Sequence, residues 1–386
     1  MRLWKRGVIA AGLVISLSAT TAACADHSAQ SGNAVASSCK STTKISIATT
    51  PYQDSLLMSL GQKLGWYAKE CLQVSFTNVD FSTTMATLAA ATTDVAWYNT
   101  TGVVSTYNRD KNLVYVSPWD IFDQGAAMMA RPSVGLTTFD DFVKQGKTPK
   151  DATAAVFQEL KGKNVVTTLG SDTGAALEMA LRRQGLPKNW IKITNLSQDQ
   201  GLALFLRGTG DVYLGGIPQR QTLVKKNYAT LIAGADLAPP PLNGFVTTKS
   251  FYDKNKDALL KLQHVTYEAI RYTQKNTDEV AKYVADTFNQ QTGGSMSPAD
   301  FTSFFQHYEH YPLNAGQAQK MIFDPDGFAY WKNIWNQDNE YLHEVSKSIP
   351  ADVPTSAFLG EQFQKAYLAK YGADETGWDS PTGSLS

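Results

Sequence analysis

The sequence of 386 residues is poor in cysteine and histidine, with three and five residues respectively, and has no excess of charge of either sign. Because 35 basic residues balance 35 acidic ones, the chain lacks the basic excess with which proteins displace counterions from phosphates, so we expect no nucleic-acid partner. The sequence also contains no P-loop, nucleophile elbow or glycine-rich dinucleotide turn. These absences predict a protein that is not an enzyme and needs no cofactor.

The N-terminal apolar run, from Gly7 to about Leu17, is too short to span the ~30 Å hydrocarbon core of a bilayer as a helix. Basic residues precede this run and small residues follow it, which is the order of a secretory signal peptide. Cys24 follows two alanines and resembles the lipidated cysteine of a bacterial lipoprotein, although Thr21 stands where leucine is usual. We therefore expect a signal peptide over residues 1–23 and a lipid anchor on Cys24. The anchor would hold the exported protein at the outer face of the cell membrane; secretion without an anchor is the alternative.

Residues 24–41 follow the signal and are small and polar, which predicts a flexible tether. Cys39 and Cys71 are the two cysteines that remain. Exported proteins meet an oxidising environment, in which these two form a disulfide or stay as unpaired thiols. We favour the disulfide, which would close a loop of about 30 residues and stabilise the fold by roughly 3–4 kcal/mol.

From residue 44 onward, short strand-like runs alternate with amphipathic helical runs. One set of strands and helices spans residues 44–116, and a second spans residues 164–226, before three consecutive prolines at 239–241. We expect a strand at 244–248, then mostly helix, and a loose tail over 372–386. The alternation predicts an α/β fold with largely parallel sheets covered by helices on both faces. With 43% hydrophobic residues, the chain can bury a core in each of two domains.

Four stretches, in this order along the chain, carry a family resemblance: residues 60–74 (LGQKLGWYAKECLQV), 93–96 (TDVA), 160–165 (LKGKNV) and 210–218 (GDVYLGGIP). They resemble the periplasmic-binding-protein-like type II lobes of importers for sulfonates, taurine, nitrate and thiamine-pyrimidine precursors. Cys71 departs from the family pattern, which has glycine at this place. The departure suits a disulfide, because neighbouring parallel strands would bring Cys39 and Cys71 together.

This resemblance implies two lobes, each a mainly parallel sheet flanked by helices, joined by a two-segment hinge and followed by a helical C-terminal extension. Lobe one would comprise residues 42–128 and 243–371, and lobe two residues 129–242. A protein of this kind captures a small-molecule solute, as a monomer, and delivers it to the permease and ATPase subunits of an ABC transporter. One alternative is an enzyme of the same fold in thiamine-pyrimidine synthesis, although none of the five histidines falls in a predicted cleft loop. A sensory lipoprotein is another.

The expected ligand-binding residues lie in the loops that follow the predicted strands, because ligands of parallel α/β sheets sit beyond the carboxyl ends of the strands. These residues are Tyr52, Gln53, Asp54, Phe81, Ser82, Trp97, Tyr98, Asn99, Thr100, Trp119, Asp120, Ser171, Asp172, Thr173, Gly216, Ile217 and Pro218. The turn at 171–173 opens a helix, so it either only caps that helix or also binds an anionic group of the solute.

Aromatic residues are dense at the predicted strand ends, which predicts a pocket for an aromatic or heterocyclic solute. A sulfonate or carboxylate group on that solute is compatible with the helix-opening turn, although Asp172 would compete with an anion for the same donors. Asp54 and Asp120 could instead face a cationic group. No metal site is expected, because His307 and His310 have no evident third ligand and residues 324–327 match only part of a calcium loop.

Overall fold

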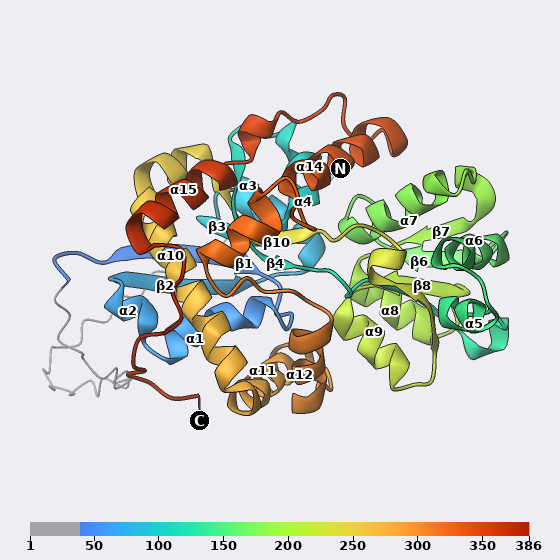
Figure 1. Cartoon of the computed structure of the whole chain (residues 1–386), viewed down its shortest axis with the longest axis horizontal. Helices are drawn as coiled ribbons and strands as arrows, with labels where there is room; N and C mark the ends of the chain where they lie inside the picture. Colours follow the sequence, from blue (N-terminus) through green and yellow to red (C-terminus); the bar gives the residue numbers. More distant parts are fainter. Residues whose placement is uncertain (1–38, 386) are drawn as a thin grey trace, which may run out of the picture. The chain divides into compact units, whose positions relative to one another are not determined.

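The computed structural model describes residues 39–385, which belong to one compact unit (Figure 1). The predictions of a signal peptide, of a lipid anchor on Cys24 and of most of the tether fall outside the described residues. Among residues 39–385, no helix has both the length and the apolar character that crossing a membrane requires. The unit contains two five-stranded sheets, which we use to define lobe one and lobe two.

Lobe one is built on a sheet with the strand order β2–β1–β3–β10–β4, in which β10 alone runs antiparallel to its neighbours. Its strands are β1 (Thr43–Thr49), β2 (Leu72–Asn78), β3 (Val95–Asn99), β4 (Leu113–Ile121) and β10 (Leu242–Thr248). Every residue of β3 and β4 is buried, as expected of strands covered on both faces.

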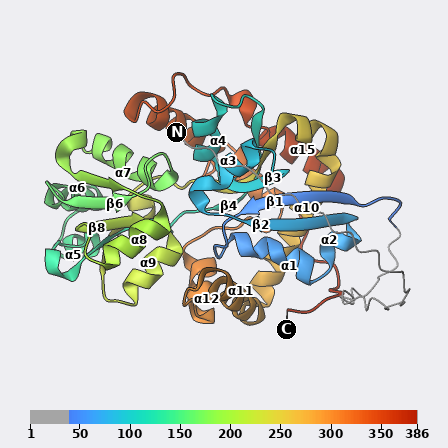
Figure 2. The ribbon, with the colours of Figure 1, turned by 180° about the vertical axis from the view of Figure 1, so that it is seen from behind.

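Lobe two is built on a sheet with the order β7–β6–β8–β5–β9, in which β5 is antiparallel to both of its neighbours. Its strands are β5 (Ala127–Ala130), β6 (Asn164–Thr167), β7 (Lys192–Asn195), β8 (Val212–Gly215) and β9 (Ala229–Ala233). Successive strand residues pack into two separate cores: Met128 and Leu214 face one side, and Met129 and Tyr213 face the other. This period of two places helices on both faces of the sheet (Figure 2).

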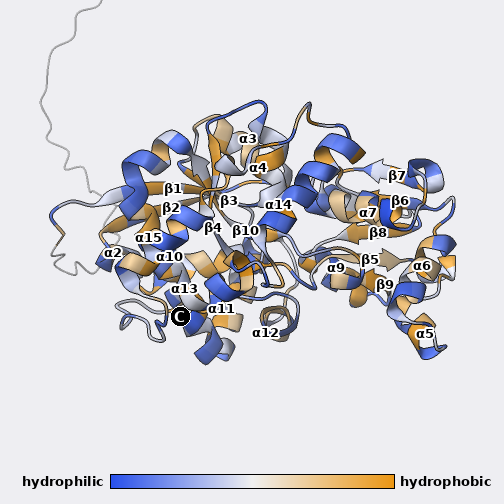
Figure 3. Cartoon of the chain, turned by 45° about the horizontal axis from the view of Figure 1, so that its top comes forward, coloured by the Kyte–Doolittle hydropathy of each residue, from blue (hydrophilic) through white to orange (hydrophobic). Residues whose placement is uncertain are grey.

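The helices of lobe two are short and flank its sheet: α5 (Phe139–Lys144), α6 (Pro149–Glu159), α7 (Asp172–Arg183), α8 (Gln198–Leu206) and α9 (Ile217–Val224). Side chains of α5, α6 and α7 fill one core, and side chains of α8 and α9 fill the other. The apolar colour of β8 and the polar colour of the edge strand β7 are seen in Figure 3.

Lobe one carries ten α-helices in the described part of the chain: α1 (Met58–Lys63), α2 (Trp66–Lys69), α3 (Thr84–Ala89), α4 (Thr100–Tyr107), α10 (Lys249–Lys275), α11 (Thr277–Thr292), α12 (Pro298–His307), α13 (Ala315–Ala318), α14 (Trp331–Asn339) and α15 (Gly360–Tyr371). Two π-helical segments follow α13 and α14, at Gln319–Phe323 and Glu340–Val345. The short 3₁₀ turns are Ser55–Leu57, Phe81–Thr83, Pro132–Val134, Lys188–Trp190, Gly234–Asp236 and Thr355–Ala357. The C-terminal helices share one continuous apolar core with the sheet of lobe one.

Two chain segments connect the lobes, one from β4 to β5 and one from β9 to β10. They run side by side, because Phe122 N–H donates to the carbonyl of Pro241 (3.1 Å) and Gly234 N–H donates to that of Ala126 (2.9 Å). The two-segment hinge, the mainly parallel sheets and the helical C-terminal extension that the sequence predicted are all present.

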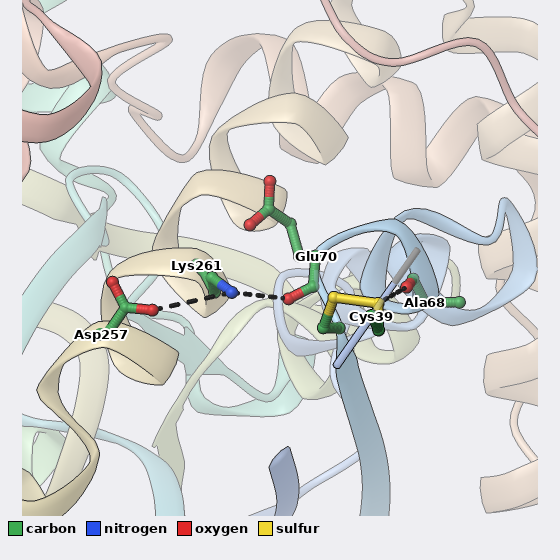
Figure 4. Close-up of a disulfide and its surroundings, with 6 residues drawn as sticks. Cys39, Ala68, Glu70, Asp257 and Lys261 are labelled. Carbon is green, nitrogen blue, oxygen red and sulfur yellow. Dashed lines mark hydrogen bonds and ion pairs between the residues drawn. A yellow bond between two sulfur atoms is a disulfide. The ribbon is translucent and has the colours of Figure 1, made fainter. Parts of the chain in front are cut away.

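The disulfide between Cys39 and Cys71 is confirmed, with 5.7 Å between the two Cα atoms (Figure 4). It ties the segment that leads into β1 to the residue directly before β2, and these strands pair in parallel along their whole length. Cys71 has a φ of 58°, in the left-handed region that favours glycine. Nearby, Lys261 Nζ donates to the carbonyl of Glu70 (3.1 Å), which holds α10 against this corner (Figure 4).

The C-terminal segment after α15 differs from the loose tail that the sequence predicted. Residues 373–385 form no helix or strand, but their backbone is hydrogen-bonded to lobe one. The indole N–H of Trp66 donates to the carbonyl of Asp379 (2.7 Å), and the N–H of Asp379 donates to the carboxylate of Glu268 (2.7 Å). Such bonds substitute for secondary structure, and sequence periodicity does not reveal them.

Candidate functional site

The expected site residues come from the carboxyl ends of β1, β2, β3 and β4 in lobe one and of β6 and β8 in lobe two. The two rims touch in this structure. Gln219 Nε2 donates to the hydroxyl of Tyr52 (3.4 Å), and Gly170 N–H donates to the hydroxyl of Tyr341 (3.2 Å). Tyr341 lies in the π-helical segment after α14, so the C-terminal extension also takes part in the contact between the lobes.

Four rings of lobe one pack together, from the turn after β1, the 3₁₀ turn after β2 and the end of β3, and we call Tyr52, Phe81, Trp97 and Tyr98 the aromatic cluster. Phe81 stacks on Tyr98 with 4.3 Å between ring centroids, and Trp97 meets the edges of Phe81 and Tyr52 at 6.0 and 6.4 Å. Gly102, in the first turn of α4, makes room for this packing, because a Cβ there would lie 2.1 Å from the ring of Tyr98. The cluster is therefore closely fitted to α4.

Two pockets open on either side of the aromatic cluster, and both are lined by residues of the two lobes. A pocket of about 440 Å³ is lined by Tyr52, by Pro218 and Gln219 of lobe two, and by α11 and α12. A pocket of about 780 Å³ is lined by Tyr98, by the exposed Ser82 and by the turn that contains Ser171. Of the four rings, Tyr52 therefore lines one pocket and Tyr98 the other, while Phe81 and Trp97 pack between them.

Several polar atoms beside the aromatic cluster are buried and make no close hydrogen bond among the described residues, namely Trp97 Nε1, Asn99 Nδ2 and Thr100 Oγ1, although Asn99 faces the carboxylate of Asp172 and Thr100 that of Asp338. Asn99 is held in place by its other side-chain atom, because Oδ1 accepts from Gly102 N–H (3.0 Å) and so caps α4. Buried polar groups are normally paired, so unpaired ones in a cleft are candidates for binding a ligand.

Lobe two contributes its rim mainly through backbone and hydroxyl groups. The Ser171 hydroxyl donates to the carbonyl of Thr168 (2.7 Å) and also lies 2.9 Å from the hydroxyl of Thr173. Ser171 therefore does not cap α7 with its side chain, which the sequence had left open. Gly216 N–H donates to Gln198 Oε1 (3.2 Å), and the adjacent Ile217 is buried at the start of α9.

Asp172 and Asp338 approach each other from opposite lobes. Both line a cavity of about 30 Å³ beside the hinge, and each has a buried oxygen without a partner in the described part of the chain. Burial raises the pKa of Asp172 to about 6. Burial also raises the pKa of Asp338 to about 7, and the nearby negative charge of Asp172 contributes to that increase. The Thr101 hydroxyl donates to Asp338 Oδ1 (2.6 Å).

A second acidic group lies at the lobe-one end of the hinge, where Asp54, Asp120 and Glu309 bring one carboxylate oxygen each within 4.8 Å of the others. Burial raises the pKa of Asp54 to about 6. It also raises the pKa of Asp120 and of Glu309 well above their usual ranges, with a further contribution from the neighbouring carboxylates. Gln53 lies on the same turn and donates to Glu309 Oε1 (2.8 Å).

Basic side chains do not neutralise these carboxylates. Within residues 39–385, no ion pair involves Asp54, Asp120, Glu309, Asp172 or Asp338. The arginine near the predicted loops, at position 220, donates to the carbonyl of residue 124 (2.8 Å) and lies over the ring of residue 308 instead. The cleft and the hinge are therefore acidic at their centre.

Trp119 is an expected site residue that lies in the core of the protein. It is completely buried in the core of lobe one and packs on Phe245, with 5.9 Å between ring centroids. Sequence reasoning missed three polar residues of the site: Asn243, Glu309 and Asp338. Glu309 and Asp338 lie in a stretch that the sequence shows only as helical, so periodicity gave no signal for either.

The architecture defines a class: two α/β lobes on a two-segment hinge, with ring and polar side chains on facing rims, are the fold of the periplasmic binding proteins. The model of the NMT1-like family matches residues 38–288, which is more than half of the chain, and the chain therefore belongs to this family. The family resemblance seen in the sequence is confirmed.

Solved structures with the same fold include the periplasmic aliphatic sulphonate binding protein SsuA from Escherichia coli, at 15% identity and a TM-score of 0.60 over 84% of this chain and 100% of that one. The alkanesulfonate-binding protein SsuA from Xanthomonas axonopodis pv. citri, bound to MOPS, matches at 15% identity with a TM-score of 0.57. The match covers 71% of this chain and 86% of that one. A mutant of the protein DSZB in complex with biphenyl-2-sulfinic acid matches at 10% identity with a TM-score of 0.55. The match covers 85% of this chain and 99% of that one. At these identities the likeness concerns the fold. No curated protein matches the sequence.

Proposed function

We propose that this protein is an exported solute-binding protein that captures a small aromatic or heterocyclic molecule between its lobes and delivers it to the permease and ATPase subunits of an ABC importer. The observation that supports this most strongly is that two rings of the aromatic cluster, Tyr52 and Tyr98, each line a pocket to which both lobes contribute. Ring walls with a few fixed polar groups suit a planar ligand.

The unpartnered polar atoms support a ring that donates and accepts hydrogen bonds. Asp172 and Asp338 offer acceptors, while Trp97 Nε1 and Asn99 Nδ2 offer donors. A heterocycle with ring nitrogens and an amino group could accept hydrogen bonds from these donors and donate to these acceptors. A sulfonate or carboxylate on the solute would have to keep away from Asp172 and Asp338 and use the donors near Ser171.

Binding would work through closure of the lobes. A solute that touches both rims stabilises the closed form by its greater affinity for that form, and the hinge segments absorb the change. The contacts between Gln219 and Tyr52 and between Gly170 and Tyr341 are of the kind that closure would form and opening would break.

The proposed location follows from the N-terminus. A signal peptide over residues 1–23 and a lipid on Cys24 would place the protein at the outer face of the cell membrane, where a solute-binding protein meets its permease. Cys24→Ala should release the protein from membranes into the soluble fraction. A fractionation pattern that is unchanged in this variant would remove the proposed anchor.

An enzyme on the same fold is the second candidate, because the DSZB protein with its bound sulfinic acid has this fold. The aromatic cluster and the neighbouring carboxylates contain no histidine, cysteine or lysine, which supports retention of a solute over its conversion. Chromatography of the solute after prolonged incubation with the protein would decide this, since a converted solute would exclude the binding-protein proposal.

A thermal-shift screen of aminopyrimidines, aromatic carboxylates and aromatic sulfonates tests the solute class. A ligand at a hundredfold excess over its dissociation constant should stabilise the protein by about 2.7 kcal/mol. The matched variants are Phe81→Leu, in the aromatic cluster, and Phe328→Leu, whose ring is exposed. We expect only Phe81→Leu to weaken binding, by about tenfold or more. A response to sulfonates alone, or an equal loss in both variants, would contradict the proposed site.

A further inference from the structure

We propose that Asp54, Asp120 and Glu309 form a binding site for a hard divalent cation, with Ca²⁺ as the expected ion. One carboxylate oxygen of each residue lies within 4.8 Å of the oxygens of the other two. A cation with metal–oxygen bonds of about 2.3–2.6 Å spans such separations. This inference does not depend on the proposed solute or on transport.

The burial of the three carboxylates requires a partner. Their residues are 2%, 0% and 3% exposed, in the order Asp54, Asp120 and Glu309. Within the described residues no lysine, arginine or histidine is ion-paired with them. Buried carboxylates are neutralised by protons or by cations, because an isolated buried charge is strongly unfavourable. A divalent cation would offset two of the three charges, and its binding would release any protons that the carboxylates hold.

Neighbouring donors orient Asp54 and Asp120. Ser55 N–H donates to Asp54 Oδ1 (2.7 Å), and Asn243 Nδ2 donates to Asp120 Oδ2 (2.7 Å) and, more weakly, to Asp54 Oδ2 (3.4 Å). The amide of Asn243 therefore holds both carboxylates at once. Such outer donors are what fixes ligand oxygens around a metal ion.

Glu309 is oriented in the same way, by Gln53 Nε2 (2.8 Å) on Oε1 and by the hydroxyl of Tyr311 on Oε2. Independent of the carboxylates, the side-chain oxygen of Gln53 is buried and has no partner among the described residues. The nitrogen of the same amide donates to Glu309 Oε1, so this unpaired oxygen belongs to a side chain in direct contact with the acidic group. Side-chain amide oxygens are common Ca²⁺ ligands, so Gln53 Oε1 is a fourth candidate ligand.

The ligand set selects the class of ion. Every available atom is an oxygen, and no cysteine or histidine of the described residues belongs to the group. Oxygen-only sites suit Ca²⁺, Mg²⁺ and Mn²⁺, whereas Zn²⁺ prefers nitrogen and sulfur. Among the oxygen-seeking ions, Ca²⁺ tolerates irregular geometry and gives up its water most readily, which a buried site demands.

The ion would act on the hinge. Asp54 follows β1, Asp120 is in β4 and Asn243 is in β10, and β4 and β10 are the strands that lead into the two hinge segments. Glu309 follows α12, and the next residue, His310, forms a β-bridge with Ile121 of β4. A bound cation would thus join the ends of three strands and one helix at the point where the lobes turn.

The test is ion binding by the purified protein after dialysis against a chelator. Calorimetry with Ca²⁺, Mg²⁺, Mn²⁺ and Zn²⁺ should show one site per chain, with Ca²⁺ the tightest, and the unfolding temperature should rise with Ca²⁺ concentration. Asp120→Asn and Glu309→Gln should each weaken Ca²⁺ binding at least tenfold. Asp324→Asn is the matched control, because residues 324–327 match part of a calcium loop but should not bind.

Three results would overturn the proposal: no uptake of any of the four ions, a preference for Zn²⁺, or a loss of binding in Asp324→Asn equal to that in the two test variants. The first result would mean that protons alone neutralise the carboxylates. Circular dichroism in the chelator checks that the variants fold. If Asp120→Asn does not fold, Gln53→Met provides the second measurement, since it removes an uncharged ligand and should still weaken Ca²⁺ binding.

Discussion

Replacing Cys39 and Cys71 together by serine removes the disulfide between them without leaving a free thiol. The bridge spans a sequence separation of 32 residues, for which the chain-entropy relation gives about 4 kcal/mol of stabilisation. Domains are stable by only about 5–15 kcal/mol, so this is a large share of the total. We expect the Cys39→Ser, Cys71→Ser variant to unfold at a clearly lower denaturant concentration than the oxidised protein.

The backbone at Cys71 adds a second and smaller magnitude that can be measured separately. Its φ of 58° is left-handed, which disfavours a residue with a Cβ atom by about 1–2 kcal/mol. Glycine adopts this conformation freely but loses more entropy on folding, which offsets part of the gain. A Cys39→Ser, Cys71→Gly variant should therefore be about 1 kcal/mol more stable than the double-serine variant.

Urea unfolding followed by tryptophan fluorescence, with and without a reductant, measures both effects. The reductant should lower the free energy of unfolding of the wild-type protein to that of the double-serine variant. The free energy of unfolding of the double-serine variant should not change with the reductant. Two outcomes would refute the reasoning. One is an oxidised protein within about 1 kcal/mol of the double-serine variant, against the expected difference of about 4 kcal/mol. The other is a glycine variant that is less stable than the serine variant.

Three further changes test other parts of the structure. Gly102→Ala places a Cβ 2.1 Å from the ring of Tyr98, so it should destabilise the protein by about 1–3 kcal/mol in urea unfolding and also weaken solute binding in the thermal-shift screen. Arg131→Ala removes hydrogen bonds to three carbonyl groups of lobe two and should lower the free energy of unfolding by about 2–4 kcal/mol in the same assay, whereas a change below about 0.5 kcal/mol would argue against these bonds. Burial disfavours the charged form of His264, but its contact with Glu375 outweighs this, so the pKa of His264 lies above 6.5. The stabilisation that protonated His264 provides is therefore complete below pH 6.5 and is lost as the pH rises through the folded-state pKa. Urea midpoints measured over this pH range should fall with rising pH in the wild type and not in Glu375→Gln.

The alternation of strands and helices could be predicted from the sequence, because it depends on local periodicity. The first set of strands and helices was expected from residue 44, and β1 spans Thr43–Thr49, while the strand expected at 244–248 lies within β10. The expected end of that set at residue 116 is too early, since β4 continues to Ile121. Trp119 was therefore placed in a loop at the strand end, whereas the additional strand residues carry it into the core.

The site was predictable only where it lies directly after a strand. The rings of Tyr52 and Phe81 follow that rule, those of Trp97 and Tyr98 lie in the last residues of β3, and the structure brings all four together. Glu309 does not, because it reaches the hinge through the packing of α12 and of the bridge between His310 and β4. The contact of Gln53 with Glu309 joins residues 256 positions apart, and it depends on tertiary packing that no local pattern encodes.

The turn after β1 links the two proposed binding events. Three consecutive residues divide their roles there: Tyr52 belongs to the aromatic cluster, Gln53 donates to Glu309, and Asp54 belongs to the acidic group at the hinge. A cation that fixes Gln53 and Asp54 must also restrict Tyr52, whose hydroxyl accepts from lobe two through Gln219. If the ion strengthens solute binding by some factor, linkage requires the solute to strengthen ion binding by the same factor. A solute-binding constant that is identical with and without Ca²⁺ would mean that the turn transmits nothing, even if both sites exist.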